Sequence, residues 1–196
     1  MFNGIIQGTG NIKDINIGQK GYIKFITNLN LKDCKNGSSI SCDGICLTII
    51  KINKIKKIYN FIVNVSDETI NRTTIKFWKK NQKINIEKSI KFNQEISGHF
   101  VYGHIDGTSK IISIKEIKNS WIFKFKYLDR KGQKFILEKG SISINGISLT
   151  VAKKFHNGFT VSIIPHTYKI TNLSDLKINN KVNIEYDMLA RYILNK

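Results

Sequence analysis

Residues 39–49 read SISCDGICLTI, and residues 141–151 repeat this stretch almost unchanged as SISINGISLTV. Each copy consists of two short alternating runs around Asp43-Gly44 or Asn145-Gly146, which are dipeptides that tolerate positive φ at both centres of a tight turn. Each copy therefore predicts a β-hairpin. The repetition of the hairpin predicts that the chain contains one kind of domain twice.

The second strand of each hairpin has one apolar face and one small polar face, because successive strand side chains alternate. Cys46 and Thr48 lie on the polar face of the first copy, and Ser148 and Thr150 take these positions in the second. The apolar faces consist of Ile45, Leu47 and Ile49 in the first copy and Ile147, Leu149 and Val151 in the second. The polar faces of the two copies thus differ chemically at one position, which is Cys46 in the first copy and Ser148 in the second.

Three further segments recur in the same order. The stretch FNGIIQGTGNI (2–12), interpreted as a strand followed by a tight bend, is echoed by VYGHIDGTSKI (101–111). The strand-like segments YNFIVNVS and KINIE of the first half correspond to GFTVSII and KVNIE of the second. Short alternating strands separated by turn residues predict two copies of an all-β barrel or sandwich.

Helix is expected to be scarce. Weak helical candidates are residues 71–76, the matching segment after Thr171, and the tail 188–194 (MLARYIL), whose apolar spacing suits an amphipathic helix. An exposed apolar stripe on this tail predicts contact with a partner subunit. The predicted domains are residues 1–97, residues 98–187 and a C-terminal helix for oligomerisation over residues 188–196.

Length and composition are those of a folded protein of two domains. The 196 residues are 41% hydrophobic, with one proline and no apolar run long enough to cross a membrane. The start MFNGIIQGTG lacks the basic and apolar regions of a signal peptide, and the three cysteines form no Cys-x-x-Cys pair. We therefore expect a cytoplasmic protein with reduced thiols and no metal site.

The formal charge of +18, from 32 Lys and Arg against 14 Asp and Glu, raises the alternative of a nucleic-acid-binding protein. The lysines alternate with Ile and Asn throughout the chain, as in KINKIKK at residues 51–57. A dedicated nucleic-acid site usually shows clustered basic residues with stacking aromatic side chains. We therefore expect no nucleic-acid partner.

Cys46 is the most reactive side chain of the repeated hairpin, and its thiolate would be a good nucleophile. The alternative is a small buried hydrophobe, which is the commoner role of cysteine. His104 stands where the first copy has Ile5, so the fold does not require a histidine there. This difference indicates acid–base work or ligand binding by His104.

Other polar candidates have structural alternatives. We interpret His99 as a capping or hydrogen-bonded structural histidine, and Asp187, before the tail, as a helix cap rather than a catalyst. His166 and its match Glu68 stand at strand ends, where loops present binding residues. The sequence contains no glycine-rich phosphate loop, serine elbow or metal-ligand cluster.

Six motifs, in order along nearly the whole chain, resemble riboflavin synthase of the α-chain type. They are MFNGIIQGTG, CDGICLT, SGHFVYGHIDGT, SINGISLTV, SIIPHT and NIEYDMLARY. The resemblance implies two six-stranded Greek-key barrels in an all-β chain, a C-terminal helix and a homotrimer, with lumazine synthase as a further associated partner. It implies no cofactor and no metal.

The resemblance also implies a reaction. One molecule of 6,7-dimethyl-8-ribityllumazine donates a four-carbon unit to a second, which gives riboflavin and 5-amino-6-ribitylamino-uracil. The active site would form between the N-terminal barrel of one subunit and the C-terminal barrel of its neighbour. The alternative is a non-catalytic antenna protein that binds lumazine or flavin, although the polar sets retained in both copies favour the enzyme.

By the same resemblance, the catalytic positions are Ser39, Cys46, His104, Thr150 and Asp187. We hypothesise that Cys46 and Ser39 act at the acceptor in the N-terminal pocket, while His104 and Thr150 serve the donor. The substrate-binding set expected in the first barrel is Gly4, Ile5, Ile6, Cys46, Leu47, Thr48, Asn64, Val65, Ser66, Asp67, Glu68 and Thr69. The set expected in the second barrel is Gly103, His104, Ile105, Lys139, Ser148, Leu149, Thr150, Ile163, Ile164, Pro165, His166, Thr167 and Tyr168.

Overall fold

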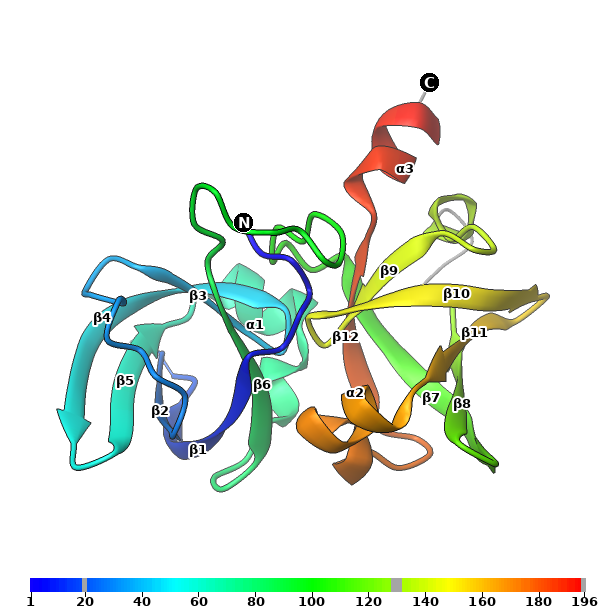
Figure 1. Cartoon of the computed structure of the whole chain (residues 1–196). Helices are drawn as coiled ribbons and strands as arrows, with labels where there is room; N and C mark the ends of the chain where they lie inside the picture. The colour runs from blue at the N-terminus through cyan, green and yellow to red at the C-terminus, as the bar shows by residue number, and fades with distance from the viewer. Residues whose placement is uncertain (19–20, 128–131, 195–196) are drawn as a thin grey trace.

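Two closed antiparallel barrels of six strands each lie side by side in the computed structural model, which describes residues 1–18, 21–127 and 132–194 (Figure 1). The first barrel has the strand order β1-β2-β5-β4-β3-β6. Its strands are β1 (Gly8–Asn16), β2 (Tyr22–Thr27), β3 (Ser39–Cys42), β4 (Ile45–Ile55), β5 (Ile58–Asn64) and β6 (Lys83–Lys88).

The second barrel repeats this arrangement with the order β10-β11-β8-β7-β12-β9. Its strands are β7 (Gly107–Ile117), β8 (Ser120–Lys126), β9 (Ser141–Ile144), β10 (Ile147–Phe155), β11 (Gly158–Ile163) and β12 (Lys181–Tyr186). The prediction of an all-β chain with two tandem six-stranded barrels is confirmed.

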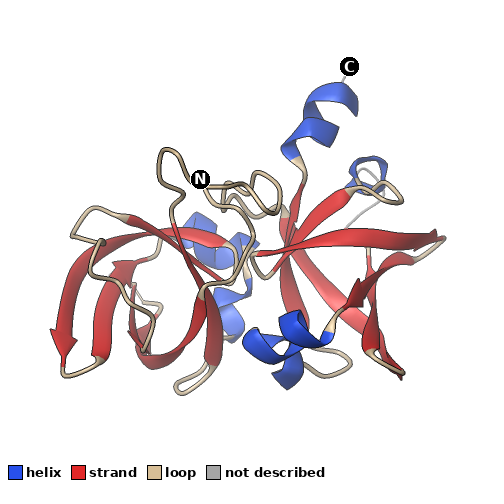
Figure 2. Cartoon of the chain, in the orientation of Figure 1, coloured by secondary structure: helices blue, strands red, loops and turns tan. Residues whose placement is uncertain are grey.

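Short helices occupy corresponding places in the two copies and gather near the seam between the barrels (Figure 2). They are α1 (Asp67–Arg72) and the 3-10 helix η1 (Thr74–Phe77) in the first copy, and α2 (Pro165–Ile170) and η3 (Asn172–Asp175) in the second. A further 3-10 helix, η2 (Gly132–Phe135), and the tail helix α3 (Met188–Leu194) complete the described elements. None of these helices has the length and apolar character needed to span a bilayer.

The structure corrects one helical expectation and confirms another. A continuous helix over residues 71–76 is wrong, because Thr73 is extended at φ −116° and separates α1 from η1. The Thr73 hydroxyl accepts a hydrogen bond from the N–H of Ile75 and so caps η1. The tail forms the predicted helix over Met188–Leu194, and the last two residues of the proposed segment 188–196 lie outside the described residues.

The repeated hairpins have the predicted geometry. Asp43 and Gly44 have φ values of 48° and 82°, and Asn145 and Gly146 have 47° and 78°. The apolar face of β4 is buried with Phe25 and Phe61, whose rings stack at 4.9 Å between centroids. The hairpins therefore supply core side chains on one face and leave Cys46 or Ser148 on the other.

The N-terminal segment differs from its predicted order of strand and then bend. The turn comes first, at Gly4 with φ 73°, and the strand β1 begins only at Gly8. Residues before β1 are held outside the first barrel, because Phe2 forms an antiparallel bridge with Val101 and the side chain of Ile6 lies in the core of the second barrel. Reciprocally, Ile105 lies in the core of the first.

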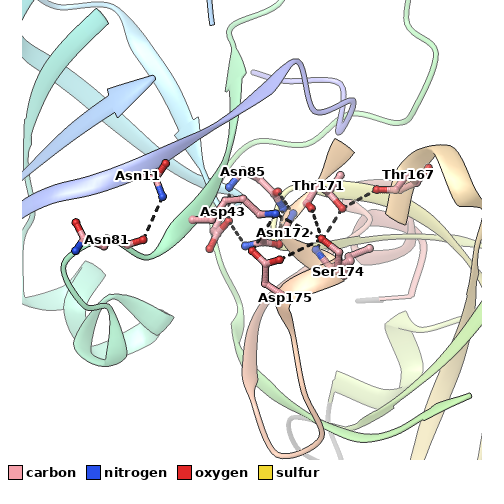
Figure 3. A network of polar contacts seen from close by, with 11 residues as sticks. Asn11, Asp43, Asn81, Asn85, Thr167, Thr171, Asn172, Ser174 and Asp175 are labelled. Carbon is pink, nitrogen blue, oxygen red and sulfur yellow. Dashed lines mark hydrogen bonds and ion pairs between the residues drawn. The ribbon is translucent and has the colours of Figure 1, made fainter. Parts of the chain in front are cut away.

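A buried polar network joins the two barrels at the seam (Figure 3). Asp43 Oδ1 accepts hydrogen bonds from the N–H of Asn85 at 2.7 Å and from Nδ2 of Asn172 at 2.9 Å. In the other copy, Asn145 Oδ1 accepts from the N–H of Asn183 at 2.8 Å. Burial raises the pKa of Asp43 to about 8, although the bonds from Asn85 and Asn172 oppose this rise. The two turns meet at this seam, because a Cβ added to Gly44 would lie 2.6 Å from the backbone nitrogen of Gly146.

Candidate active site

Cys46 lies on the polar face of β4, half-buried beneath a segment that arrives from the second half of the chain. Its N–H donates to the carbonyl oxygen of Gly103 at 3.0 Å. Gly103 has φ 79°, and a Cβ added to it would lie 2.5 Å from the Cβ of Cys46. Only glycine therefore allows residues 102–105 to cross so close to β4.

A cavity of about 370 Å³ opens where this segment crosses the barrel. It is lined by six residues of the predicted set, namely Cys46, Glu68, Thr69, Gly103, His104 and Ile105. A volume of this size suits a small heterocyclic ligand. The structure thus brings the thiol of Cys46 and the exposed imidazole of His104 to one cavity within a single chain.

Two ion pairs at this cavity were not predicted from the sequence. Arg72 pairs with Glu68, one helical turn before it on α1, and Arg191 of α3 pairs with Asp106. All four residues line the cavity. The spacing between Glu68 and Arg72 was a detectable signal, whereas the pairing of Arg191 with Asp106 depends on where the tail lies. The two pairs give the cavity charged walls.

The second copy builds a related arrangement around Ser148. The N–H of Ser148 donates to the carbonyl oxygen of Gly4 at 2.7 Å, as Cys46 does to Gly103. Ser148 Oγ also lies 2.6 Å from Nδ1 of His99. Burial lowers the pKa of His99, and the nearby Asp187 carboxylate opposes this effect. His99 is the hydrogen-bonded histidine that was predicted.

These contacts correct the predicted grouping of the binding residues. Gly4, Ile5 and Ile6 were expected with Cys46 in the first barrel, but Gly4 contacts Ser148 of the second. His104 was predicted to serve the donor, and within one chain it lines the same cavity as Cys46. The reason is the crossing of the two glycine segments, since each covers the barrel that does not contain the strand following it.

Three predicted catalytic positions, Ser39, Thr150 and Asp187, and the predicted binding residue Thr48 lie outside the Cys46 cavity. Thr48 and Thr150 are exposed on the polar faces of β4 and β10. Ser39 is half-buried on β3, and its carbonyl oxygen accepts from the hydroxyl of Ser89. Asp187 caps α3, because its Oδ1 accepts from the N–H of Leu189 at 3.0 Å, as the helix-cap interpretation predicts.

Lys139 occupies a turn that the first copy makes with glycine. Its φ is 67°, and its N–H donates to the carbonyl oxygen of Val151 at 2.8 Å. Gly37, at φ 89°, donates in the same way to Ile49. A lysine in this left-handed conformation costs backbone energy that glycine does not, and Lys56 and Lys118 have the same conformation. The side chain of Lys139 is exposed.

Three kinds of environment account for the remaining predicted binding residues. Leu47, Val65 and Ile163 are buried in the barrel cores, so only their backbone could meet a ligand. Ser66 caps α1, and Tyr168 stacks on Trp121 with 3.9 Å between ring centroids. The rest are exposed or half-buried in the segment before β1, within β10, at strand ends and on α1 or α2, and comprise Ile5, Leu149, Asn64, Ile164, Asp67, Pro165, His166 and Thr167.

No group of three or more His, Cys, Asp or Glu side chains suited to a metal ion occurs among residues 1–18, 21–127 and 132–194. Cys34, Cys42 and Cys46 are all free thiols. Burial raises the pKa of the Cys42 thiol well above its ordinary value, with smaller contributions from Asp43 and Cys46. Cys42 is therefore a core residue, whereas Cys46 lines the cavity.

Comparison with known proteins agrees with this double arrangement. The model of the lumazine binding domain matches residues 3–89 and again residues 102–187. A riboflavin synthase of Actinobacillus pleuropneumoniae is 39% identical over 98% of this chain and 88% of its own length. A riboflavin synthase of Bacillus subtilis is 37% identical, with the same coverage of both chains.

The fold is also found in solved structures. The structure of LumP in complex with 6,7-dimethyl-8-(1'-D-ribityl) lumazine superposes with a TM-score of 0.81, at 24% identity over 94% of this chain and 98% of LumP. At this identity the likeness extends to the fold alone. The two domain matches and the nearly full-length relatives place this chain in the riboflavin synthase family.

Proposed function

We propose that this chain catalyses the reaction of its family and forms riboflavin from 6,7-dimethyl-8-ribityllumazine. One lumazine gives up a four-carbon unit to the other, and 5-amino-6-ribitylamino-uracil is the second product. The two products together contain the atoms of the two substrates, so the reaction needs no external oxidant, reductant or cofactor. The chain thus acts as a transferase with one small molecule in both substrate roles.

The observation that carries this proposal is the meeting of Cys46 and His104 at one cavity. The reaction requires a proton to leave the C7 methyl group of one lumazine and a nucleophile or water to add to the other. An imidazole and a thiol are groups that move protons or add to electrophilic carbon near neutral pH. We assign both to the lumazine bound at the first barrel.

The two related site halves suit a reaction between two copies of one molecule. The Cys46 cavity would hold one lumazine, and the Ser148 side, with Thr150 and Lys139, would hold the second. Holding both reactants makes the bimolecular step nearly unimolecular, an advantage that can reach roughly 7–11 kcal/mol. Ser39 and Asp187 would act at the edges of these two halves.

A complete site would join the first barrel of one subunit to the second barrel of its neighbour in a homotrimer. The tail supports this assembly, because Leu189, Tyr192 and Ile193 on α3 are exposed apolar side chains. We place the enzyme in the cytoplasm and retain lumazine synthase, whose product would be this substrate, as an associated partner. The domain limits 1–97, 98–187 and 188–196 belong to the same proposal.

The proposal is tested by mixing purified protein with 6,7-dimethyl-8-ribityllumazine in the presence of a chelator and following riboflavin by absorbance and fluorescence. Steady conversion is expected. Cys46→Ser, which gives the first copy the residue of the second, is expected to lower kcat by roughly 10²–10⁴. Saturable lumazine binding without riboflavin formation by the wild type would instead identify a binding protein.

A further inference from the structure

Two buried glutamates hold the glycine segments that complete the two site halves. Glu185 of β12 accepts the N–H of Tyr102 at Oε1 (2.7 Å) and the N–H of Gly103 at Oε2 (2.9 Å). Glu87 of β6 does the same in the other copy, with Asn3 at 2.7 Å and Gly4 at 3.1 Å. Both carboxyl groups therefore use two oxygens to fix two successive backbone N–H groups.

Each segment has its other side against the opposite barrel. The carbonyl oxygen of Gly103 accepts the N–H of Cys46 at 3.0 Å, and the next residue, His104, lines the cavity. Glu185 is thus linked to the cavity through the backbone of Tyr102 and Gly103, which its carboxylate holds, and through β4, which Gly103 contacts. A displacement of this backbone would move both Cys46 and His104, because one contacts it and the other follows it in the chain.

We propose that Glu185 is a positioning residue, which sets the distance between Cys46 and His104, and that Glu87 has the same role at Ser148. This inference rests on the proposed function where it concerns turnover. Its structural part stands on the hydrogen bonds alone. Glu185 touches neither the cavity nor the reacting atoms, so it acts only through the segment 102–104.

The chemistry of the two positions requires a group with two acceptors. Glu87 and Glu185 are almost fully buried, so an N–H group that lost its partner there would not reach water easily. Burial raises the pKa of Glu185 to about 7, and bonds from the N–H groups of Tyr102, Gly103 and His104 oppose that rise. Glutamine keeps the shape but offers one acceptor oxygen, and its amide nitrogen would face an N–H donor.

The first test compares Glu185→Gln with Glu87→Gln by hydrogen exchange and mass spectrometry. In Glu185→Gln, peptides that cover residues 101–105 are expected to exchange faster, whereas peptides that cover residues 2–6 keep their protection. In Glu87→Gln the pattern is reversed. Equal loss of protection in both peptides of both variants, or no change in either, would overturn the inference. If Glu185→Gln does not fold, Glu185→Asp, which keeps both acceptors on a shorter side chain, replaces it in the same comparison.

The second test measures the site. Site-resolved alkylation of Cys46 by iodoacetamide is expected to be faster in Glu185→Gln and unchanged in Glu87→Gln. Turnover of 6,7-dimethyl-8-ribityllumazine by Glu185→Gln is expected to fall about 10- to 100-fold in kcat, with a smaller change in KM, because positioning acts on the reacting geometry. If Glu185→Gln turned over the substrate at the wild-type rate, the inference would be contradicted. A wild-type rate of Cys46 alkylation in this variant would contradict it as well. If the wild type forms no riboflavin, the proposed function fails while exchange and alkylation still decide the role of Glu185.

Discussion

Gly103 is the residue where the Cys46 cavity depends most directly on the absence of a side chain. A Cβ at this position would lie 2.5 Å from the Cβ of Cys46 and 2.6 Å from its backbone nitrogen, and φ is 79°. Gly103→Ala is therefore expected to lower the free energy of unfolding by about 2–4 kcal/mol, through backbone strain and lost contact with β4. The midpoint temperature of thermal unfolding and the rate of riboflavin formation would both decrease.

Gly37 supplies the matched control. It also has positive φ, at 89°, but an added Cβ would meet nothing within 4 Å. Gly37→Ala should therefore lower the free energy of unfolding by about 1 kcal/mol, through backbone strain alone, and leave the turnover per folded molecule unchanged. Equal losses of stability and activity in the two variants would mean that close contact between Gly103 and Cys46 is not required.

Asp43 is a buried acid at a seam position where the other copy has Asn145, and this predicts a dependence of stability on pH. Its pKa is about 8 in the folded protein, against an ordinary value of 3.8, because of burial. The folded state therefore binds the proton more tightly, so the stability contributed by neutral Asp43 is present below about pH 4 and is lost as pH rises through about 8.

Asp43→Asn should remove the part of the pH dependence of stability that comes from Asp43. The variant is expected to match the wild type below about pH 4 and to melt several degrees higher at pH 9, since 1 kcal/mol corresponds to roughly 2–4 °C in a chain of this size. Some pH dependence should remain, because burial also raises the pKa of Glu87 and Glu185 to about 7. The reciprocal substitution Asn145→Asp should make the loss of stability with rising pH steeper. Identical melting curves for wild type and Asp43→Asn at pH 9 would contradict the assignment.

At the scale of elements, α3 projects away from both barrels (Figure 1) and carries exposed Leu189 and Ile193. In the proposed trimer these side chains pack on neighbouring subunits. The wild type should therefore show a mass near three times 22.5 kDa by light scattering. Leu189→Asp combined with Ile193→Asp should shift it to the monomer, since a charge buried without a partner is strongly unfavourable.

Ile55→Asp is the control for the added charge, because Ile55 is an exposed isoleucine at the end of β4. It should leave the trimer intact. A trimer that persists in the double α3 variant would remove this helix from the proposed interface. A monomeric wild type would exclude the homotrimer itself.

The elements that sequence could predict are those whose signal is local. The hairpins at Asp43-Gly44 and Asn145-Gly146 carry both turn chemistry and strand alternation, so their geometry followed directly. The order within residues 2–12 did not, because Ile6 is apolar on account of the other barrel's core rather than a strand of its own. A period-two pattern reports burial, but not which core provides it.

The candidate site, too, could be predicted only where the signal was local in the sequence. Cys46 and His104 stood out because each breaks the repeat, and the structure brings them to one cavity. Their grouping could not be read from chain order, since the glycine segments cross between the barrels. Glu185 recurs with Glu87 in the repeated segments KINIE and KVNIE, but its role could not be predicted, and neither could the pairing of Asp106 with Arg191, because a buried acceptor or a distant ion pair has meaning only once its partners are close.

At the scale of the whole molecule, the crossing makes each barrel depend on a segment of the other half. Ile105 is buried in the core of the first barrel, and Gly103 accepts the N–H of Cys46 on its surface. A fragment of residues 1–97 would lack both contacts, whereas a fragment of residues 1–106 would retain them. Burial of one isoleucine side chain contributes about 1.5–3 kcal/mol, so the longer fragment should be more stable by at least that order.

Urea unfolding of the two fragments, followed by tryptophan fluorescence of Trp78 in the first barrel, measures this difference. In the longer fragment, Ile105→Ala should abolish most of the gain, because it removes the side chain that enters the core. Ile96→Ala is the control, since Ile96 is exposed and present in both fragments. Equal stability of fragments 1–97 and 1–106 would show that the two barrels are energetically separate units and that the crossing segments serve the site alone.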